Sequence, residues 1–336
     1  MRLQVRKTVR AWPHRAMIAG GCVALEFALS ACTLIEYRPE VVIGTGRPGG
    51  VYFPLGDSIC RMLNLDLPAR GLRCAAYPSR GPVANIEALH AGRIDIGIVQ
   101  SDVLTDAIRG EGPFASQRPD SELRVLFTGQ TEAFTIVARR ELEIRAASDL
   151  RGRRINLGSP GSGERVSMNR VMAALGFAPS DFAAARELPL AQQHDAFCAR
   201  ELDAIVYMVR HPNGLIEEVI RTCDGVLVDV SGPRIESLLA SHAEYSRSII
   251  AGNTYTGNPE AVATLGVRTA IITTTRLPET VAYDITKALF ENIDDFRRLH
   301  PDFATLLPRD MVPGAAEVPV HAGAAHYYRE RGWSRE

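Results

Sequence analysis

The fold class is decided by the stretch Leu89-His90-Ala91-Gly92-Arg93-Ile94-Asp95-Ile96-Gly97-Ile98-Val99. It reads as the end of a helix, a tight turn, an aspartate and then a buried strand. The same order returns a little over 100 residues later, in Phe197-Cys198-Ala199-Arg200-Glu201-Leu202-Asp203-Ala204-Ile205-Val206-Tyr207. A helix followed by a fully apolar strand is typical of parallel α/β sheets. The repeat therefore predicts two similar α/β lobes rather than one continuous sheet; the alternative is a chance likeness of two short units.

Outward from these stretches, short apolar runs alternate with amphipathic segments along the chain. A strand, a glycine-rich turn and a helix occur at 41–63 and again at 154–175. Periodicity and turn residues delimit the other elements in the same way. The predicted strands are 41–43, 72–77, 94–99, 123–127, 134–138, 154–157, 202–207, 226–230 and 267–273. The predicted helices are 51–63, 82–91, 165–175, 190–199, 212–221, 278–299 and 322–331.

Length and composition exclude several classes of protein. The chain has 336 residues, of which 46% are hydrophobic, and 38 Lys and Arg against 39 Asp and Glu. The length favours two domains, and the hydrophobic fraction is that of a folded protein. A net charge of −1 lacks the basic surface of a nucleic-acid-binding protein. No apolar run has the 18 or more residues of a membrane-spanning helix, so an integral membrane protein is not expected.

Residues 1–31 have the proportions of a signal peptide that is removed on export. Arg2, Arg6, Lys7, Arg10 and Arg15 precede an apolar stretch, 16–31, which Glu26 interrupts. The stretch ends in Leu29-Ser30-Ala31-Cys32, which resembles the lipobox of bacterial lipoproteins, in which the cysteine is lipidated and becomes the first mature residue. The alternative is cleavage near Ser30 without lipidation. The exported chain has 33 basic and 38 acidic side chains, so an acyl anchor at Cys32 would hold it to the membrane, not surface charge.

Four cysteines remain in the exported body: Cys60, Cys74, Cys198 and Cys223. An oxidising compartment favours disulfides, and four cysteines allow three connectivities, between which the spacing does not decide. A zinc site is not expected, because the chain has no C-x-x-C and no nearby pair of histidines.

The two glycine-rich turns each open a helix, whose free N–H groups suit a carboxylate or phosphate. The first, Gly44-Thr45-Gly46-Arg47-Pro48-Gly49, matches G-x-G-x-x-G, but the next strand has no acidic residue for a ribose, which disfavours a dinucleotide. The alternative for both turns is a merely structural one. The chain contains neither G-x-S-x-G nor H-E-x-x-H, so we predict no enzyme, no metal and no cofactor.

Several segments together resemble the TAXI-type solute receptors of TRAP (tripartite ATP-independent periplasmic) transporters, over about residues 41–331. They are Gly44–Tyr52, Gly97–Asp102, Asn156–Arg165, His211–Gly214, Thr222–Asp224, Thr286–Asn292 and His300-Pro301. The chain departs from the family pattern at Arg47-Pro48, Glu164 and Arg80-Gly81-Pro82.

The resemblance implies a type II periplasmic-binding-protein fold, with two α/β lobes joined by crossover segments around a central ligand cleft. We place lobe I at 33–134 with 256–336 and lobe II at 135–255. The family takes small organic anions, such as acidic amino acids, glutamate among them, or dicarboxylates, and delivers them to TRAP membrane subunits. It also implies the disulfides Cys60–Cys74 and Cys198–Cys223.

On this basis we predict a periplasmic receptor that closes over an anion. The predicted ligand-binding residues are Thr45, Gly49, Tyr52, Ser79, Gln100, Ser101, Ser159, Gly161, Ser162, Arg165, Tyr207 and His211. Structural alternatives stay open for three of them: an ion pair for Arg165, a core position for Tyr52 and a helix cap for His211. Two other functions also stay open, a ligand-sensing lipoprotein that feeds a signalling partner and an exported enzyme acting on a small anion.

Overall fold

The structure is a computed structural model that describes residues 40–48, 50–314 and 318–333. The predicted signal peptide 1–31, Cys32 and Gly49 lie outside these residues. Within them, no helix combines the length and the apolar character needed to cross a bilayer.

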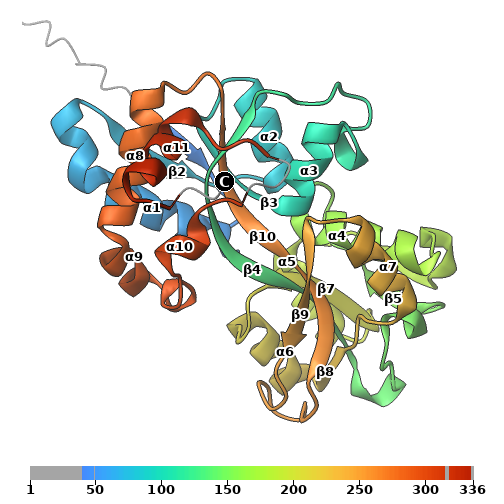
Figure 1. The fold of residues 1–336 in the computed structure, drawn as a ribbon. Helices are drawn as coiled ribbons and strands as arrows, with labels where there is room; N and C mark the ends of the chain where they lie inside the picture. The colour runs from blue at the N-terminus through green and yellow to red at the C-terminus, as the bar shows by residue number, and fades with distance from the viewer. Residues whose placement is uncertain (1–39, 49, 315–317, 334–336) are drawn as a thin grey trace, which may run out of the picture. The chain divides into compact units, whose positions relative to one another are not determined.

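Strands and helices alternate as the sequence predicts, and Figure 1 shows their arrangement. The strands are β1 (Glu40–Gly44), β2 (Arg73–Tyr77), β3 (Ile96–Gln100), β4 (Leu123–Arg139), β5 (Arg154–Asn156), β6 (Ala184–Arg186), β7 (Ala204–Val209), β8 (Gly225–Val228), β9 (Tyr245–Ile250) and β10 (Val262–Thr274). The α-helices are α1 (Tyr52–Asp66), α2 (Pro82–His90), α3 (Ser101–Arg109), α4 (Gly163–Leu175), α5 (Leu190–Cys198), α6 (Gly214–Cys223), α7 (Pro233–Ser241), α8 (Glu279–Glu291), α9 (Ile293–Leu299), α10 (Pro308–Met311) and α11 (Ala322–Glu330).

Local sequence explains where these elements begin and end. Every residue of β3 and β7 is buried, as expected for strands covered on both faces. Helix α4 begins after Ser162, whose hydroxyl accepts a hydrogen bond from the backbone N–H of Arg165. It ends at Gly176, which has a φ of 71°, a left-handed value that glycine adopts without strain.

Two long strands, β4 and β10, link the two lobes of the protein. Lobe I carries β1–β3 with α1–α3 and α8–α11, and lobe II carries β5–β9 with α4–α7. In Figure 1, β4 and β10 run side by side from the helices of lobe I to those of lobe II. Each lobe has apolar cores on both faces of its strands, around Ile59 and Val103 in lobe I and around Val171 and Ile205 in lobe II.

The two predicted lobes are present, but the expectation that their strands would not form one continuous sheet is wrong. The strands follow one hydrogen-bonded path, β2-β1-β3-β10-β4-β7-β5-β6, with β8 on β4 and β9 on β10. The path is continuous because β4 and β10 pair with each other from Leu123 and Thr274 to Ala133 and Gly266. Their register is irregular between Arg268 and Ala270, where the strands pass from one lobe to the other.

Other elements also differ from the sequence prediction, and α3, β6 and α10 lie where it predicted no element. The predicted strands 123–127 and 134–138 are parts of β4, because Thr128, Thr131 and Glu132 between them pair with β10. The predicted helix 278–299 is two helices, α8 and α9, which meet at Asn292, where φ is −106° and ψ is 25°. Helix α7 and strand β9 lie in a region for which the sequence predicted no element.

Candidate functional site

A cavity of about 520 Å³ lies between the two lobes. Lobe I contributes the loop from β1 into α1, the start of α2, the end of β3 and residues 300–302. Lobe II contributes the starts of α4 and α5 and the segment from the end of β7 into α6, and β4 contributes Glu132. The volume falls within the range of small-molecule sites, which in α/β proteins lie at the ends of strands.

The two glycine-rich loops approach each other at this cavity. The guanidinium of Arg47, in the first loop, donates a hydrogen bond to the hydroxyl of Ser159, in the second. Gln100 packs closely on Gly163: a Cβ at this position would lie 1.9 Å from Oε1 of Gln100, so a larger residue would have to displace the end of that side chain. Gly81 has a φ of 124° and lies against the carbonyl of Gly161. The start of α2 in lobe I and the start of α4 in lobe II therefore lie close together at the cavity.

Four of the predicted site residues line the cavity: Tyr52, Gln100, Ser162 and Tyr207. Tyr52 is the first residue of α1, Gln100 is the last of β3, Ser162 caps α4 and Tyr207 lies in β7.

Other predicted site residues do not line the cavity but contact backbone groups of neighbouring loops. The hydroxyl of Thr45 donates to the carbonyl of Tyr77 at 2.8 Å, and Ser79 donates to the carbonyl of Thr45 at 2.9 Å, which joins the loops after β1 and β2. Gly161 presents its carbonyl to Gly81.

Ser101, Arg165 and His211 also have protein partners. Ser101 donates to the carbonyl of Glu244 at 2.8 Å and accepts from the N–H of Arg268. Arg165 forms an ion pair with Glu187 and donates to Asn169 at 3.0 Å.

The ring of His211 lies between Thr135 and Tyr255, at 2.8 Å and 2.6 Å from their hydroxyl oxygens. Burial lowers the pKa of His211 to about 4, so the ring is neutral at pH 7. The cis peptide bond after His211 brings Pro212 to the cavity wall.

The cavity wall also carries the charged residues Arg47, Arg80, Glu132 and Glu164, of which the sequence did not predict Glu132. Glu132 is the acidic residue within the apolar strand β4, and an acid in such a strand was a usable signal. Arg47, Arg80 and Glu164 belong to the departures from the family pattern, which the sequence places at the cleft without assigning them to the ligand. The cavity thus contains groups of both charges.

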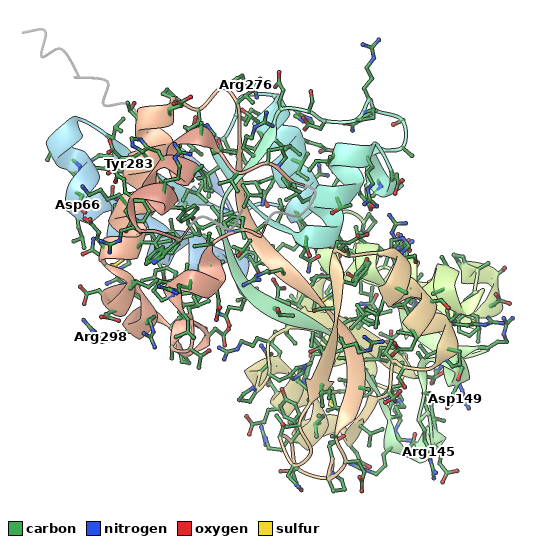
Figure 2. The ribbon with its side chains drawn as sticks, viewed as in Figure 1. Asp66, Arg145, Asp149, Arg276, Tyr283 and Arg298 are labelled. Carbon is green, nitrogen blue, oxygen red and sulfur yellow. A yellow bond between two sulfur atoms is a disulfide. The ribbon has the colours of Figure 1, made fainter. Side chains whose placement is uncertain are left out.

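Burial of the carboxyl groups raises their pKa values. The pKa of Glu132 rises to about 7 because the side chain is removed from water; hydrogen bonding to the carboxyl opposes the rise, and the nearby Asp102 adds to it. Burial raises the pKa of Glu164 as well, while Arg47 acts in the opposite direction. The outer surface behaves differently: Asp149, labelled in Figure 2, accepts hydrogen bonds from the N–H groups of Ala146 and Arg145, which lower its pKa.

Beside the cavity, the lobes are joined through a buried carboxyl. Asp102 of α3 accepts hydrogen bonds from Ser167 of α4 at 2.7 Å and from the hydroxyl of Tyr245 of β9 at 2.9 Å. Burial raises the pKa of Asp102 to about 6 against the effect of these bonds. Asp106 of the same helix forms an ion pair with Arg170. The contacts hold lobe I against lobe II in this conformation.

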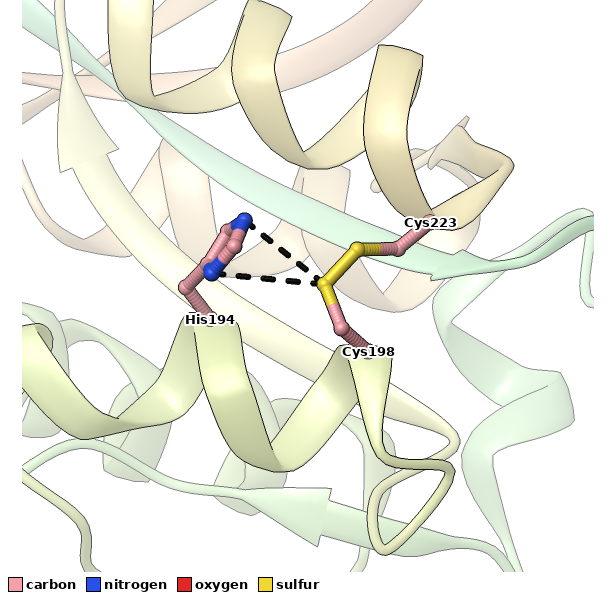
Figure 3. A group of neighbouring side chains, drawn as sticks. All are labelled: His194, Cys198 and Cys223. Atoms are coloured by element: carbon pink, nitrogen blue, oxygen red, sulfur yellow. Dashed lines mark hydrogen bonds between the residues drawn. A yellow bond between two sulfur atoms is a disulfide. The ribbon is translucent and has the colours of Figure 1, made fainter.

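The disulfide pairings implied by the resemblance are confirmed. Cys60 bonds to Cys74 and Cys198 to Cys223, with Cα–Cα distances of 5.0 and 5.1 Å. His194 lies beside the second disulfide, with Nε2 at 3.6 Å from the sulfur of Cys198, as Figure 3 shows. These three side chains have the proximity of metal ligands, all within 4.8 Å. Metals bind the thiolate form, however, so the oxidised pair does not supply a zinc site.

Solved structures of other proteins share this architecture. PhnD1 from Prochlorococcus marinus, solved in complex with methylphosphonate, matches with a TM-score of 0.53 and 11% identity, over 88% of this chain and 100% of that chain. The alkanesulfonate-binding protein SsuA from Xanthomonas axonopodis pv. citri, bound to MOPS, matches with a TM-score of 0.46 and 16% identity, over 86% and 83%. The likeness to PhnD1 confirms the predicted type II periplasmic-binding-protein fold. A model of the NMT1-like family matches residues 43–332, and the chain therefore belongs to that family.

Proposed function

We propose that this protein is the extracytoplasmic solute-binding subunit of a TAXI-type TRAP transporter. It captures a small organic anion, an acidic amino acid or a dicarboxylate, between its two lobes and delivers it to the membrane subunits. The observation that carries the proposal is the cavity of about 520 Å³, to which both lobes contribute walls. A site divided between lobes that share two crossover strands favours capture by closure. We propose the lobe boundaries as 33–134 with 256–336 and 135–255.

The positive groups at the cavity support an anionic ligand. Arg47 is half-buried and Arg80 is exposed, and both line the cavity. The start of α4, at Ser162 and Gly163, adds the positive end of a 13-residue helix. An arginine and a helix N-terminus together are a common arrangement for binding a carboxylate. PhnD1, which shares the fold, was solved with methylphosphonate, itself a small anion.

The TRAP assignment and the location rest on the sequence. Five of the seven segments that resemble TAXI receptors, among them Asn156–Arg165, contribute residues to the cavity wall. We propose that the signal peptide 1–31 directs export and that acylation of Cys32 holds the protein at the membrane. Mass spectrometry of the mature N-terminus tests this: a diacyl or triacyl mass on Cys32 supports it, and an unmodified terminus near Ser30 contradicts it.

Calorimetry of the exported domain against a panel of organic acids tests the ligand class. The protein is first unfolded and refolded, to remove any co-purified ligand. We expect a dissociation constant well below millimolar for at least one acid, and a smaller radius of gyration by X-ray scattering when it is bound. If no acid binds better than millimolar and none changes the radius, the receptor function is wrong.

Uptake into vesicles that contain the partner membrane subunits tests the transporter class. A TRAP system continues to accumulate the ligand without ATP as long as an ion gradient persists. Uptake that requires ATP and ignores the gradient contradicts the TRAP assignment but leaves solute binding intact.

A further inference from the structure

Three buried oxygen-bearing side chains meet at the inner end of the cavity. They are Glu132 of β4, Gln100 of β3 and Tyr52 of α1, which are 4%, 2% and 7% exposed. All three line the cavity. They come from three different elements, so the grouping is a product of the fold and not of one local motif.

Two of these three side chains, Tyr52 and Gln100, have an oxygen without a partner in the described part of the chain. Thr269 of β10 donates its hydroxyl hydrogen to the Glu132 carboxyl. The hydroxyl of Tyr52 lies beside the same carboxyl, but among the described residues neither it nor Oε1 of Gln100 has a partner in hydrogen-bonding geometry. A buried polar atom without a partner is costly to a folded protein. Oε1 of Gln100 is an acceptor only, so what it needs is a donor.

We propose that these three groups form a subsite for a protonated amino group of the ligand. A primary ammonium has three N–H donors, and Glu132, Gln100 and Tyr52 offer three acceptor oxygens. The inference rests on the proposed receptor function and deepens it: the ligand is a zwitterion, with its carboxylate toward Arg47 and the start of α4, rather than a dicarboxylate.

The charges around Glu132 favour this occupant. Asp102 on α3 raises the energy of a second negative charge at this end of the cavity, and Tyr52 and Thr269 are uncharged. Glu164 adds another carboxyl to the wall. A ligand carboxylate at Glu132 would have to bring a proton with it, because two adjacent carboxylates repel each other. An ammonium instead pairs with the ionised carboxylate directly.

Matched ligand pairs provide the test, with the exported domain at pH 7.5. L-glutamate is compared with glutarate and L-aspartate with succinate, because each pair differs only in the ammonium. We expect the amino acid of the better-binding pair to bind at least about tenfold more tightly. Glu132→Gln should weaken that amino acid by about 10- to 100-fold and leave the dicarboxylate nearly unchanged. Glu143→Gln, a change at an exposed glutamate outside the cavity, is the matched control.

The pH dependence of the affinity is an independent test, because it has opposite directions for an ammonium and for a dicarboxylate ligand. Because burial raises the pKa of Glu132 to about 7, an ammonium ligand should bind about tenfold more tightly for each pH unit between 5 and 6.5. A dicarboxylate held by the protonated carboxyl should lose affinity over the rise through pH 7. Circular dichroism and the melting temperature are used to check that Glu132→Gln is folded.

The outcomes separate the two proposals. If glutarate or succinate binds as tightly as its amino acid, or if affinity falls as the pH rises, the ammonium subsite is wrong and the receptor function stands. If no acid binds but putrescine binds in a manner that Glu132→Gln abolishes, the subsite stands and the anion assignment is wrong. If nothing in the panel binds to the wild-type protein, both are wrong.

Discussion

Replacing the buried Glu132 should stabilise the free protein in a pH-dependent way. The Glu132 carboxyl has a pKa of about 7 in the folded chain, against 4.5 for an ordinary glutamate. Between these values the folded protein keeps the proton that the unfolded chain has released. Unfolding therefore releases a proton, and the free energy of unfolding falls as the pH rises through this window. The contribution is fully present below pH 4.5 and is lost by about pH 7.

The magnitude follows from the two pKa values. Their difference corresponds to about 3 kcal/mol, since each pKa unit is worth about 1.4 kcal/mol. Glu132→Gln keeps the shape of the side chain and an oxygen for the Thr269 hydroxyl, but it cannot ionise. Relative to the wild type, the variant should gain stability from pH 5 to pH 8, by at most about 3 kcal/mol.

Urea unfolding at pH 5, 6, 7 and 8, in the absence of ligand, measures this difference. The pKa of Asp102 is also raised, to about 6, and both proteins carry this carboxyl, so the difference between them reports the titration of Glu132 and its coupling to Asp102. Glu143→Gln should follow the wild type at every pH. A stability difference between Glu132→Gln and the wild type that stays constant from pH 5 to pH 8 would refute the buried, proton-holding carboxyl.

Three other predictions concern the cavity wall, the contact between the lobes and the second disulfide. Arg47→Ala should weaken an organic-acid ligand by about 10- to 100-fold in calorimetry, and Arg165→Ala should weaken it less, because Arg165 is engaged by Glu187; the reverse order would contradict this geometry. Tyr245→Phe removes a hydroxyl that donates to the buried carboxylate of Asp102 in the other lobe. It should lower the unfolding free energy by about 2 kcal/mol at pH 7.5. An unchanged urea midpoint at that pH would refute the contact. Replacing Cys198 and Cys223 together by serine removes a cross-link between residues 25 apart and should lower the unfolding free energy by about 3 kcal/mol. A wild-type urea midpoint that does not change when a reducing agent is added would contradict this prediction.

Much of the fold follows from local patterns. The fully buried strands β3 and β7 were predicted from apolar runs, because a parallel strand covered on both faces has no polar positions. The two disulfides followed from the resemblance to a family, since the spacing alone allowed three connectivities. The error at β4 has a clear cause: a glycine and polar residues separate its two apolar runs, but pairing with β10 continues on both sides of the irregularity between Arg268 and Ala270.

The candidate site was predicted less completely. The helix starts at both glycine-rich loops were anticipated, since glycine turns before helices are visible in sequence. Several hydroxyls assigned to the ligand, such as those of Thr45 and Ser101, are instead bonded to distant backbone groups. A serine or threonine has the same signature whether it meets a ligand or a carbonyl, so its partner depends on what the fold brings within reach.

The sequence by itself determined the alternation of strands and helices, the glycine turns that start two helices and the acidic balance of the exported chain. Only the tertiary structure decided which polar groups share the cavity. Gln100 and Thr269 face each other in the register of β3 and β10, and Thr269 reaches Glu132 across 137 residues of sequence. Local patterns act over a few residues, whereas strand pairing between distant segments sets which buried charges meet. The carboxyl at the inner end of the cavity therefore became visible only in the folded chain.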